Sequence, residues 1–459
     1  SVNSNLDCLI ASGCDTRIAI GHDGLNRYGC ASAPRDAVPF GSCTCSSPSR
    51  RGINRAKEVL RRLQGSATPE LEAMSVCQEH RERLKELLTL PSNVEIAFSP
   101  SGTDAELLSL ALVMMKSRRP VVNVVVGPTE VGSGTPLAAG GRHYDTACPR
   151  GDRVTPGEPV CRELANGVTV RSVEIRDEHG VMLEESLIDA AIVQIVSETV
   201  EAGAHALVHV VAHSKTGVHA PSLDCIERIS RHLPKDVSVV IDAAQGRISR
   251  RGLRSVLTAG HQVIFTGSKF YGGPAFSGAL LVPQSIYTSL ARHESGLRQD
   301  TWFQGLGKYF SSLDLPVSWS TIRGWLPVWI NYGSLLRWSA ALAEIEAYYS
   351  VSARCRLAVL RAFEKEVPML FGGSPSIQLL PVFPPLTDDA QTRLLESKTT
   401  VFAFRVLVDG KTLSHSELKD IHGQLNHGFP SSGEDRVRSA DARTAFHLGQ
   451  PVRFRDGSA

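Results

Sequence analysis

Seven short apolar segments alternate with helical stretches between residues 94 and 283, and this alternation restricts the possible folds more than any other feature. The predicted strands are 94–98, 121–126, 168–175, 205–212, 237–241, 262–266 and 278–282. Strands that alternate with helices are typical of βαβ units, in which the strands run parallel and helices cover the sheet. We therefore predict an α/β fold with a mainly parallel sheet that binds its ligand at the carboxyl edge.

A turn of small residues follows the first of these strands. Residues 99–106 read SPSGTDAE and lead into an apolar helix. Free backbone N–H groups and the positive end of the helix dipole make such a turn a binding site for phosphate, here at Ser101, Gly102 and Thr103. An ordinary N-cap by Ser101 or Thr103 is the alternative interpretation. The turn has neither a Walker-type lysine nor a GxGxxG pattern, which disfavours nucleotide binding.

An acid and a lysine follow two later strands. Asp242 ends one strand and begins the sequence DAAQ, and Lys269 comes 27 residues later in TGSKFYGG. Pyridoxal phosphate (PLP) enzymes need a lysine that forms a Schiff base and a carboxylate that keeps the pyridine nitrogen protonated. Either residue alone would be read as a surface lysine or a turn-forming aspartate. Together with the phosphate turn, they favour a PLP site.

As an ordered set, the three segments resemble the fold-type I PLP-dependent enzymes, in the class V aminotransferase and cysteine desulfurase-like family, from about residue 50 to 290. The resemblance implies that Lys269 forms the Schiff base, Asp242 pairs with the ring nitrogen and Gln245 contacts the ring hydroxyl. The implied phosphate contacts come from small residues of two turns, namely Ser101, Gly102, Thr103, Thr266 and Ser268. The resemblance also implies a homodimer.

Two departures from the family pattern affect the expected site. If Glu130 aligns with the family's glutamate, the position that stacks on the ring falls on Val131 instead of histidine. The family's usual S-N-x-x-G motif reads HSKTG at residues 213–217, so His213 or Ser214 stands where its asparagine would contact the cofactor. We predict that Ser214 is the cofactor contact. Lys215 in the same motif is the one rival to Lys269 for the Schiff base.

Composition narrows the class of protein. Of 459 residues, 42% are hydrophobic and 21% are charged, which is typical of a globular chain. The net charge of +2 gives no basic field for nucleic acid or a membrane surface. No apolar run reaches transmembrane length and no signal peptide is visible, from which we expect a cytoplasmic protein. The missing initiator methionine leaves open a domain of a longer polypeptide.

Ten cysteines scattered along the chain do not make a disulfide scaffold. Cys43 and Cys45 have C-x-C spacing without a second pair, so we expect no metal site. Cys355 is the sole cysteine beyond residue 225 and falls in a predicted helix. The family's desulfurases carry a mobile cysteine in this part of the chain, so a desulfurase is disfavoured unless Cys43 or Cys45 approaches the site.

The predicted organisation has three parts: an N-terminal arm that lines the substrate site (1–50), a large PLP-binding domain (51–320) and a small α+β C-terminal domain (321–459). Helical patterns fall at 52–64, 69–89, 333–348, 352–366 and near 415–426, and a C-terminal strand at 400–408. The aromatic-rich residues 299–323 are interpreted as an active-site or subunit-interface loop.

The expected substrate is a small amino acid, whose carboxylate an arginine of the C-terminal domain would hold by its planar fork. The candidates are Arg436, Arg438, Arg443 and Arg453. We favour a carbon–sulfur lyase that acts on a cysteine-derived substrate by Cα deprotonation and β-elimination. A class V aminotransferase is a close alternative. A PLP-fold domain that acts on a carrier-bound substrate, or has no activity, is a third.

Overall fold

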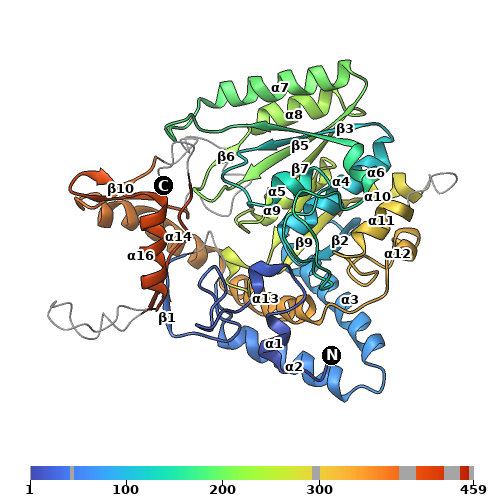
Figure 1. The fold of residues 1–459 in the computed structure, drawn as a ribbon, viewed down its shortest axis with the longest axis horizontal. Coiled ribbons are helices and arrows are strands. Elements are labelled where there is room, and N and C mark those ends of the chain that lie inside the picture. The colour runs from blue at the N-terminus through green and yellow to red at the C-terminus, as the bar shows by residue number, and fades with distance from the viewer. Residues whose placement is uncertain (1, 42–45, 292–299, 382–399, 428–444, 454–459) are drawn as a thin grey trace.

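The computed structural model describes residues 2–41, 46–291, 300–381, 400–427 and 445–453. Its centre is a sheet with the strand order β2-β9-β8-β7-β5-β3-β4, and β6 pairs with β5 at one side (Figure 1). The strands are β2 (Val94–Ser99), β3 (Val121–Val126), β4 (Val168–Val173), β5 (His205–Ala212), β6 (His219–Ala220), β7 (Val237–Ala243), β8 (Gln262–Thr266) and β9 (Gly278–Pro283).

All seven predicted strands of this region are confirmed, and so is the mainly parallel sheet. Neighbours from β4 to β8 pair parallel, whereas β9 runs antiparallel to both β8 and β2. Two reversals bring β2 back to the direction of β8, so the carboxyl ends of β2, β3, β5, β7 and β8 lie at the same edge. The predicted α/β class is therefore correct.

Apart from the partly exposed edge strand β4, the sheet is buried on both faces, which explains why its inner strands are mostly apolar runs rather than alternating ones. Along β7, Val239 and Ile241 pack into one core and Val240 into the other. Helix α4 (Gly102–Ser117) covers the second face together with α10 (Gln284–Ala291). Helices α7 (Glu185–Glu201), α8 (Leu223–His232) and α9 (Arg250–Thr258) cover the first face, where Figure 1 shows α7 and α8 above the sheet.

The N-terminal helices form a third core with a helix from the far end of the chain. α1 (Leu6–Ile10), α2 (Arg50–Gly65) and α3 (Pro69–Leu88) pack against α13 (Tyr332–Ser350). The same α13 inserts Trp338, Ala341 and Ile345 into the core beneath the sheet. Because α13 packs with the large body, we infer that the small unit begins after Ser350, whereas the sequence predicted a boundary at residue 321.

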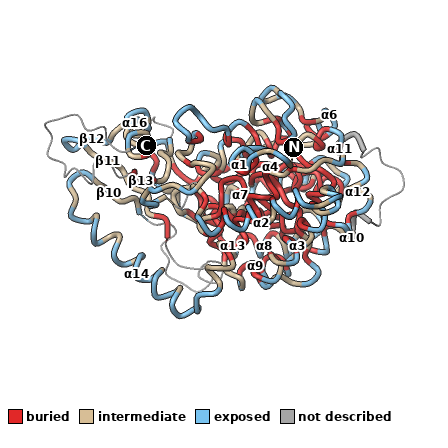
Figure 2. Tube along the Cα trace, turned by 90° about the horizontal axis from the view of Figure 1, so that it is seen from below, coloured by how far each residue is buried: buried red, intermediate tan, exposed pale blue. Residues whose placement is uncertain are grey.

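The small unit contains α14 (Ala353–Phe371), a three-stranded antiparallel sheet and α16 (His415–His427). The sheet strands are β10 (Ile377–Leu379), β11 (Phe404–Val408) and β12 (Lys411–Thr412), so the predicted strand 400–408 is shorter than expected. Separately, β1 (Ala37–Pro39) pairs parallel with β13 (Ala445–His447), which ties the N-terminal arm to this unit. Figure 2 shows the buried residues concentrated in the large body and few in the small unit.

The described part of the aromatic-rich segment, residues 300–323, packs within the chain, and the predicted interface role stays a prediction. It contains α11 (Asp300–Leu306), which contacts the short helix α6 (Arg162–Asn166), and the start of α12 (Ser320–Trp325); the short helix α5 (Thr135–Ala139) contacts α4. Phe303, Tyr309, Phe310 and Trp319 are buried in the core that α4 shares. Aromatic side chains bury a large apolar area, and here that area packs within the chain. No described helix has the length and hydropathy needed to cross a membrane.

We predict that Gly267→Ala destabilises the fold by about 1–3 kcal/mol, as overpacked cores do. An added Cβ would lie 2.7 Å from the Cβ of Ala341 and 3.3 Å from the ring of Trp338. Ala341→Gly should restore part of this loss, which a double-mutant cycle by denaturant unfolding would measure.

Gly324→Ala is the matched control, because a Cβ at this helical glycine meets no atom within 4 Å. It should leave stability unchanged or raise it slightly. Equal unfolding free energies for Gly267→Ala and Gly324→Ala would contradict the tight packing of α13 against the loop after β8.

Candidate functional site

The strand ends meet at a cavity of about 800 Å³ at the carboxyl edge of the sheet. Nine of the ten residues predicted to contact the cofactor line it: Ser101, Gly102, Thr103, Val131, Asp242, Gln245, Thr266, Ser268 and Lys269. The tenth, Ser214, does not. These residues come from the turns after β2, β3, β7 and β8, so the geometry brings them together while their chemical roles remain predictions.

The turn after β2 combines a helix cap with free donors. The hydroxyl of Ser101 accepts a hydrogen bond from the Asp104 backbone N–H (3.2 Å) and donates one to the Asp104 carboxylate (2.5 Å). Ser101 is thus the N-cap of α4, the alternative that the sequence left open. A Cβ at Gly102 would be tightly packed, 3.2 Å from the Cγ2 of Ile264. No described residue bonds the backbone N–H groups of Gly102 and Thr103, which therefore remain available to an anion.

Lys269 lies at the start of a 3₁₀ turn with a φ of 59°, in the left-handed region. Five other described residues besides glycine share positive φ values, and they fall into two groups. Thr89 and Arg118 end helices, and Asp409 lies in the turn between β11 and β12, where such values are common.

The remaining two, His213 and Phe276, line the same cavity as Lys269. Strained backbone in a non-glycine residue costs on the order of 1–3 kcal/mol and clusters at functional sites. The backbone geometry thus marks this cavity independently of the sequence motifs.

Asp242 is placed on the face of the sheet that α4 covers, in register with Val211 of β5. Its Oδ1 accepts a hydrogen bond from the Ala244 N–H (3.0 Å), which orients the carboxylate toward the cavity it lines. Beneath the same face, the Nε2 of His209 lies 3.0 Å from a carboxylate oxygen of Glu106, and both are buried. Burial lowers the pKa of His209, but the charge of Glu106, its hydrogen bond and the charge of Asp242 together outweigh burial and raise the pKa.

A buried network replaces the contact that we predicted for Ser214. The Ser214 hydroxyl donates to the Glu130 carboxylate, which also pairs with Arg176 and accepts from Thr216. Ser214 therefore holds the turn after β5 in place, and its neighbours His213 and Lys215 line the cavity instead. Burial lowers the pKa of the His213 imidazole well below its usual value, with Arg247 and His219 adding to the effect.

Three further predicted residues have partners of their own. Thr266 donates its hydroxyl to the Ala244 carbonyl (2.6 Å), and Ser268 donates to Thr266 (3.3 Å). The Gln245 side-chain oxygen accepts from Arg247 (3.0 Å). These bonds fix the turns after β7 and β8 against each other at the cavity wall.

The sequence missed the part of the wall formed by the N-terminal arm and α16. Arg17 and residues 23–29 line the cavity, as do His415, Lys419 and His422 of α16. No motif or spacing sets Arg17 apart among the 49 lysines and arginines. The one usable signal was the general prediction that residues 1–50 line the substrate site.

The predicted carboxylate-binding arginines receive little support. Arg436, Arg438 and Arg443 lie outside the described residues. Arg453 is exposed and does not line the cavity. Lys215 does line it, so the rival to Lys269 is near enough to need an experimental test.

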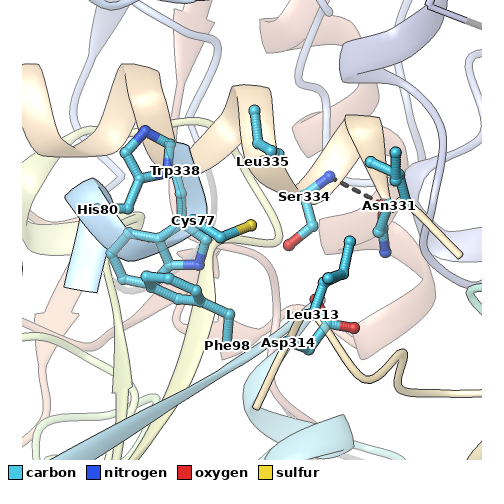
Figure 3. A pocket seen from close by; sticks show the side chains of 10 residues that line it. Cys77, His80, Phe98, Leu313, Asp314, Asn331, Ser334, Leu335 and Trp338 are labelled. Carbon is cyan, nitrogen blue, oxygen red and sulfur yellow. Dashed lines mark hydrogen bonds between the residues drawn. The ribbon is translucent and has the colours of Figure 1, made fainter. Parts of the chain in front are cut away.

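Two other clusters carry no comparable geometry. Figure 3 shows a cavity between α3 and α13 lined by His80, Asp314 and Trp338 among others, but its volume of about 10 Å³ holds at most about one water. Ligand atoms of Cys14, Asp15 and Asp104 lie within 4.8 Å of one another. Both oxygens of Asp15 already bind the Arg17 guanidinium, so this cluster is organised around an arginine.

Solved structures share this architecture. A C-DES lysine-to-alanine mutant with glycine covalently linked to its PLP cofactor matches with a TM-score of 0.53 and 14% identity, over 85% of this chain and 88% of its own. The chain has the fold of the fold-type I PLP-dependent enzymes.

Other similar structures are more distant in shape. The apo cysteine desulfurase of Thermococcus onnurineus NA1 matches at a TM-score of 0.46 and 15% identity, over 85% of this chain and 82% of its own. The cysteine desulfurase CsdA of Escherichia coli matches at a TM-score of 0.47 and 14% identity, over 85% of this chain and 83% of its own. No family model and no curated protein matches the chain.

We predict that Asp104→Asn changes how stability depends on pH. Burial raises the pKa of the Asp104 carboxyl to about 6, Asp15 adds to this, and the hydroxyls of Ser101 and Tyr144 oppose it. A raised carboxyl pKa favours folding while the group is protonated, and the wild type loses this stability as the pH rises from about 4 to about 6. The asparagine variant does not lose this stability. Above about pH 6, the pH-dependent change in unfolding free energy therefore differs between the two chains by on the order of 3 kcal/mol.

Urea unfolding of both chains at pH 4, 5, 6 and 8 measures the effect. The difference between variant and wild type should grow up to about pH 6 and then stay constant. Parallel curves across this range would mean that Asp104 titrates normally.

Proposed function

We propose that this chain is a PLP-dependent enzyme that holds its cofactor through Lys269 and cleaves a carbon–sulfur bond in a cysteine-derived amino acid. The observation that carries the proposal is the position of Lys269, which lies with strained backbone in a cavity of about 800 Å³. Asp242 and the anion-binding turn at Gly102 and Thr103 line the same cavity. The shared fold supports this proposal, since the C-DES structure with this fold carries PLP.

The residues present fit the cofactor's chemical groups one by one. The free N–H groups of Gly102 and Thr103 at the start of α4 suit a phosphate. The Asp242 carboxylate suits a protonated pyridine nitrogen, and the Lys269 amine suits an aldehyde. Val131 and Ala244 supply apolar lining, so Val131 can pack against the ring but cannot act as an acid or base.

The bound cofactor would supply an electron sink for negative charge at the substrate Cα. The chain's own groups would then move the proton. The Lys269 amine would take the proton from the substrate Cα. Asp242 would pair with the ring nitrogen. His213 adds an imidazole at the cavity, uncharged at neutral pH because burial lowers its pKa.

The placement of the cysteines supports a lyase that uses no cysteine nucleophile. Cys355 is exposed on α14, and no described cysteine lines the cavity. Cys43 and Cys45 lie outside the described residues, so the cysteine-dependent alternative rests on them. The same lysine and aspartate would also serve an aminotransferase, which is why the product analysis below separates the two.

The proposed partner is a small amino acid, and a homodimer is implied by the resemblance to the family. A cytoplasmic location is an expectation from sequence. Action on a carrier-bound substrate would require a larger polypeptide, and turnover of free amino acids would argue against it.

Lys269→Ala should abolish both turnover and the visible absorption band of covalently held PLP, because the variant has no amine to bond the aldehyde. Lys215→Ala is the matched control, since both lysines line the same cavity. It should keep the band and at least a measurable fraction of turnover. The reverse pattern would move the Schiff base to Lys215.

We expect sustained release of pyruvate and a sulfur product from cysteine, cystine or an S-substituted cysteine, without an added keto acid. Mass spectrometry and a coupled pyruvate assay would follow the reaction of PLP-loaded chain. Conversion that stops after one equivalent, with the cofactor left as its amine form, would instead establish an aminotransferase.

Cysteine-to-serine variants complete this test. Cys355→Ser should leave release unchanged, because Cys355 is exposed on α14 and does not line the cavity. Loss of sulfur release in a Cys43→Ser, Cys45→Ser chain that still binds PLP would establish a desulfurase that uses a cysteine nucleophile.

A further inference from the structure

Arg17 of the N-terminal arm is a buried cation at the cavity wall. The residue is 7% exposed, and its guanidinium carbon lies 5.4 Å from the ring centre of Tyr144 and 5.3 Å from that of Phe276. A charged side chain is rarely buried unless its donors are satisfied. The acceptors of the Arg17 N–H donors, and any donor left without an acceptor, therefore indicate what the side chain can bind.

The Asp15 carboxylate binds one edge of the Arg17 guanidinium. Its two oxygens accept from Nε (2.8 Å) and Nη2 (2.6 Å) in a bidentate pair, which sets the plane of the group. The second Nη2 hydrogen goes to the Ser101 hydroxyl (3.1 Å), and Nη1 approaches the Thr103 hydroxyl at 3.4 Å. Of the five N–H donors of the side chain, one on Nη1 has no partner among the described residues.

The unpartnered donor lies beside the free backbone donors of α4. Nη1 is on the side of Thr103, whose own N–H is free and whose hydroxyl can still donate while it accepts from Arg17. Ser101 offers no such donor, because its hydroxyl donates to Asp104 and accepts from both Arg17 and the Asp104 N–H. The available donors are therefore Gly102 N–H, Thr103 N–H, Thr103 O–H and Arg17 Nη1–H.

The local charges also favour an anion at this point. Asp15 faces the opposite edge of the guanidinium, so its negative charge is paired away from Nη1. The Asp104 carboxylate accepts hydrogen bonds from the hydroxyls of Ser101 and Tyr144, which offset its negative charge. The positive end of the α4 dipole adds to the guanidinium charge.

We propose that Arg17 is the charged binding residue for the phosphate group of the cofactor, acting together with the N terminus of α4. This inference rests on the proposed function, since it takes PLP as the ligand. It gives the N-terminal arm a direct part in cofactor binding, which the phosphate turn alone did not imply.

The phosphate itself provides the test, because pyridoxal has the same aldehyde and ring without it. Apo chain is titrated with PLP and, separately, with pyridoxal, and the absorption of the covalently held ligand gives each dissociation constant. Arg17→Met should weaken PLP binding by about 10- to 100-fold, the value of a hydrogen bond to a charged group. Pyridoxal binding should be unchanged.

Two control variants separate binding from folding. Asp15→Asn with Arg17→Met removes the buried carboxylate that Arg17→Met would leave unpaired, and it should show the same selective loss of PLP affinity. Arg27→Gln removes a positive charge from the same cavity wall without touching the turn, and it should keep the wild-type ratio of PLP to pyridoxal affinity.

Each outcome is decisive. Equal weakening for both ligands, or no weakening, would overturn the role of Arg17 and leave the proposed function standing. Failure of the unaltered chain to bind PLP at all would overturn the proposed function and this inference together.

Discussion

A sheet that is buried on both faces can present polar groups only at the ends of its strands. Here α4 covers one face, and α7, α8 and α9 cover the other, so the strand interiors are closed to solvent. Six strands end at the same edge, and the polar turns that follow five of them, β2, β3, β5, β7 and β8, open into one space. The position of the cavity is thus a consequence of strand direction, and the antiparallel β9 is what allows β2 to deliver its turn to that edge.

Local sequence was sufficient for much of this arrangement. All seven strands, the phosphate turn and the Asp242 and Lys269 turns were predictable, because apolar periodicity and small-residue turns are properties of short segments. Failures arose where tertiary packing decides. The aromatic residues of segment 299–323 were interpreted as an active-site or subunit-interface loop, whereas Phe303, Tyr309, Phe310 and Trp319 pack in the core that α4 shares. Helix α13 joins the large body through Trp338. The bond between Ser214 and the buried Glu130 could not be predicted, because the two residues are 84 positions apart.

The strained residues of the site are held by packing from outside the sheet. Phe276 has a positive φ, and its carbonyl accepts a hydrogen bond from the buried Arg337 of α13 (2.8 Å). Gly267 and Gly273 leave no space for a Cβ against Ala341, so α13 presses on both sides of the loop that carries Lys269. Strain of this kind persists where the surroundings determine the backbone more strongly than local preference does.

Arg337 also donates to the carbonyls of Ile10, Ser12 and Gly13, just before the segment that bears Arg17. The two partners in the first of these bonds are 327 residues apart. During synthesis, the beginning of the chain therefore emerges long before the helix that fixes it in place. The strands and their turns can assemble while the N-terminal arm is still unanchored. The wall of the cavity is completed last, because α16, which also lines it, leaves the ribosome after α13, so a cofactor would meet a finished binding site only on a nearly full-length chain.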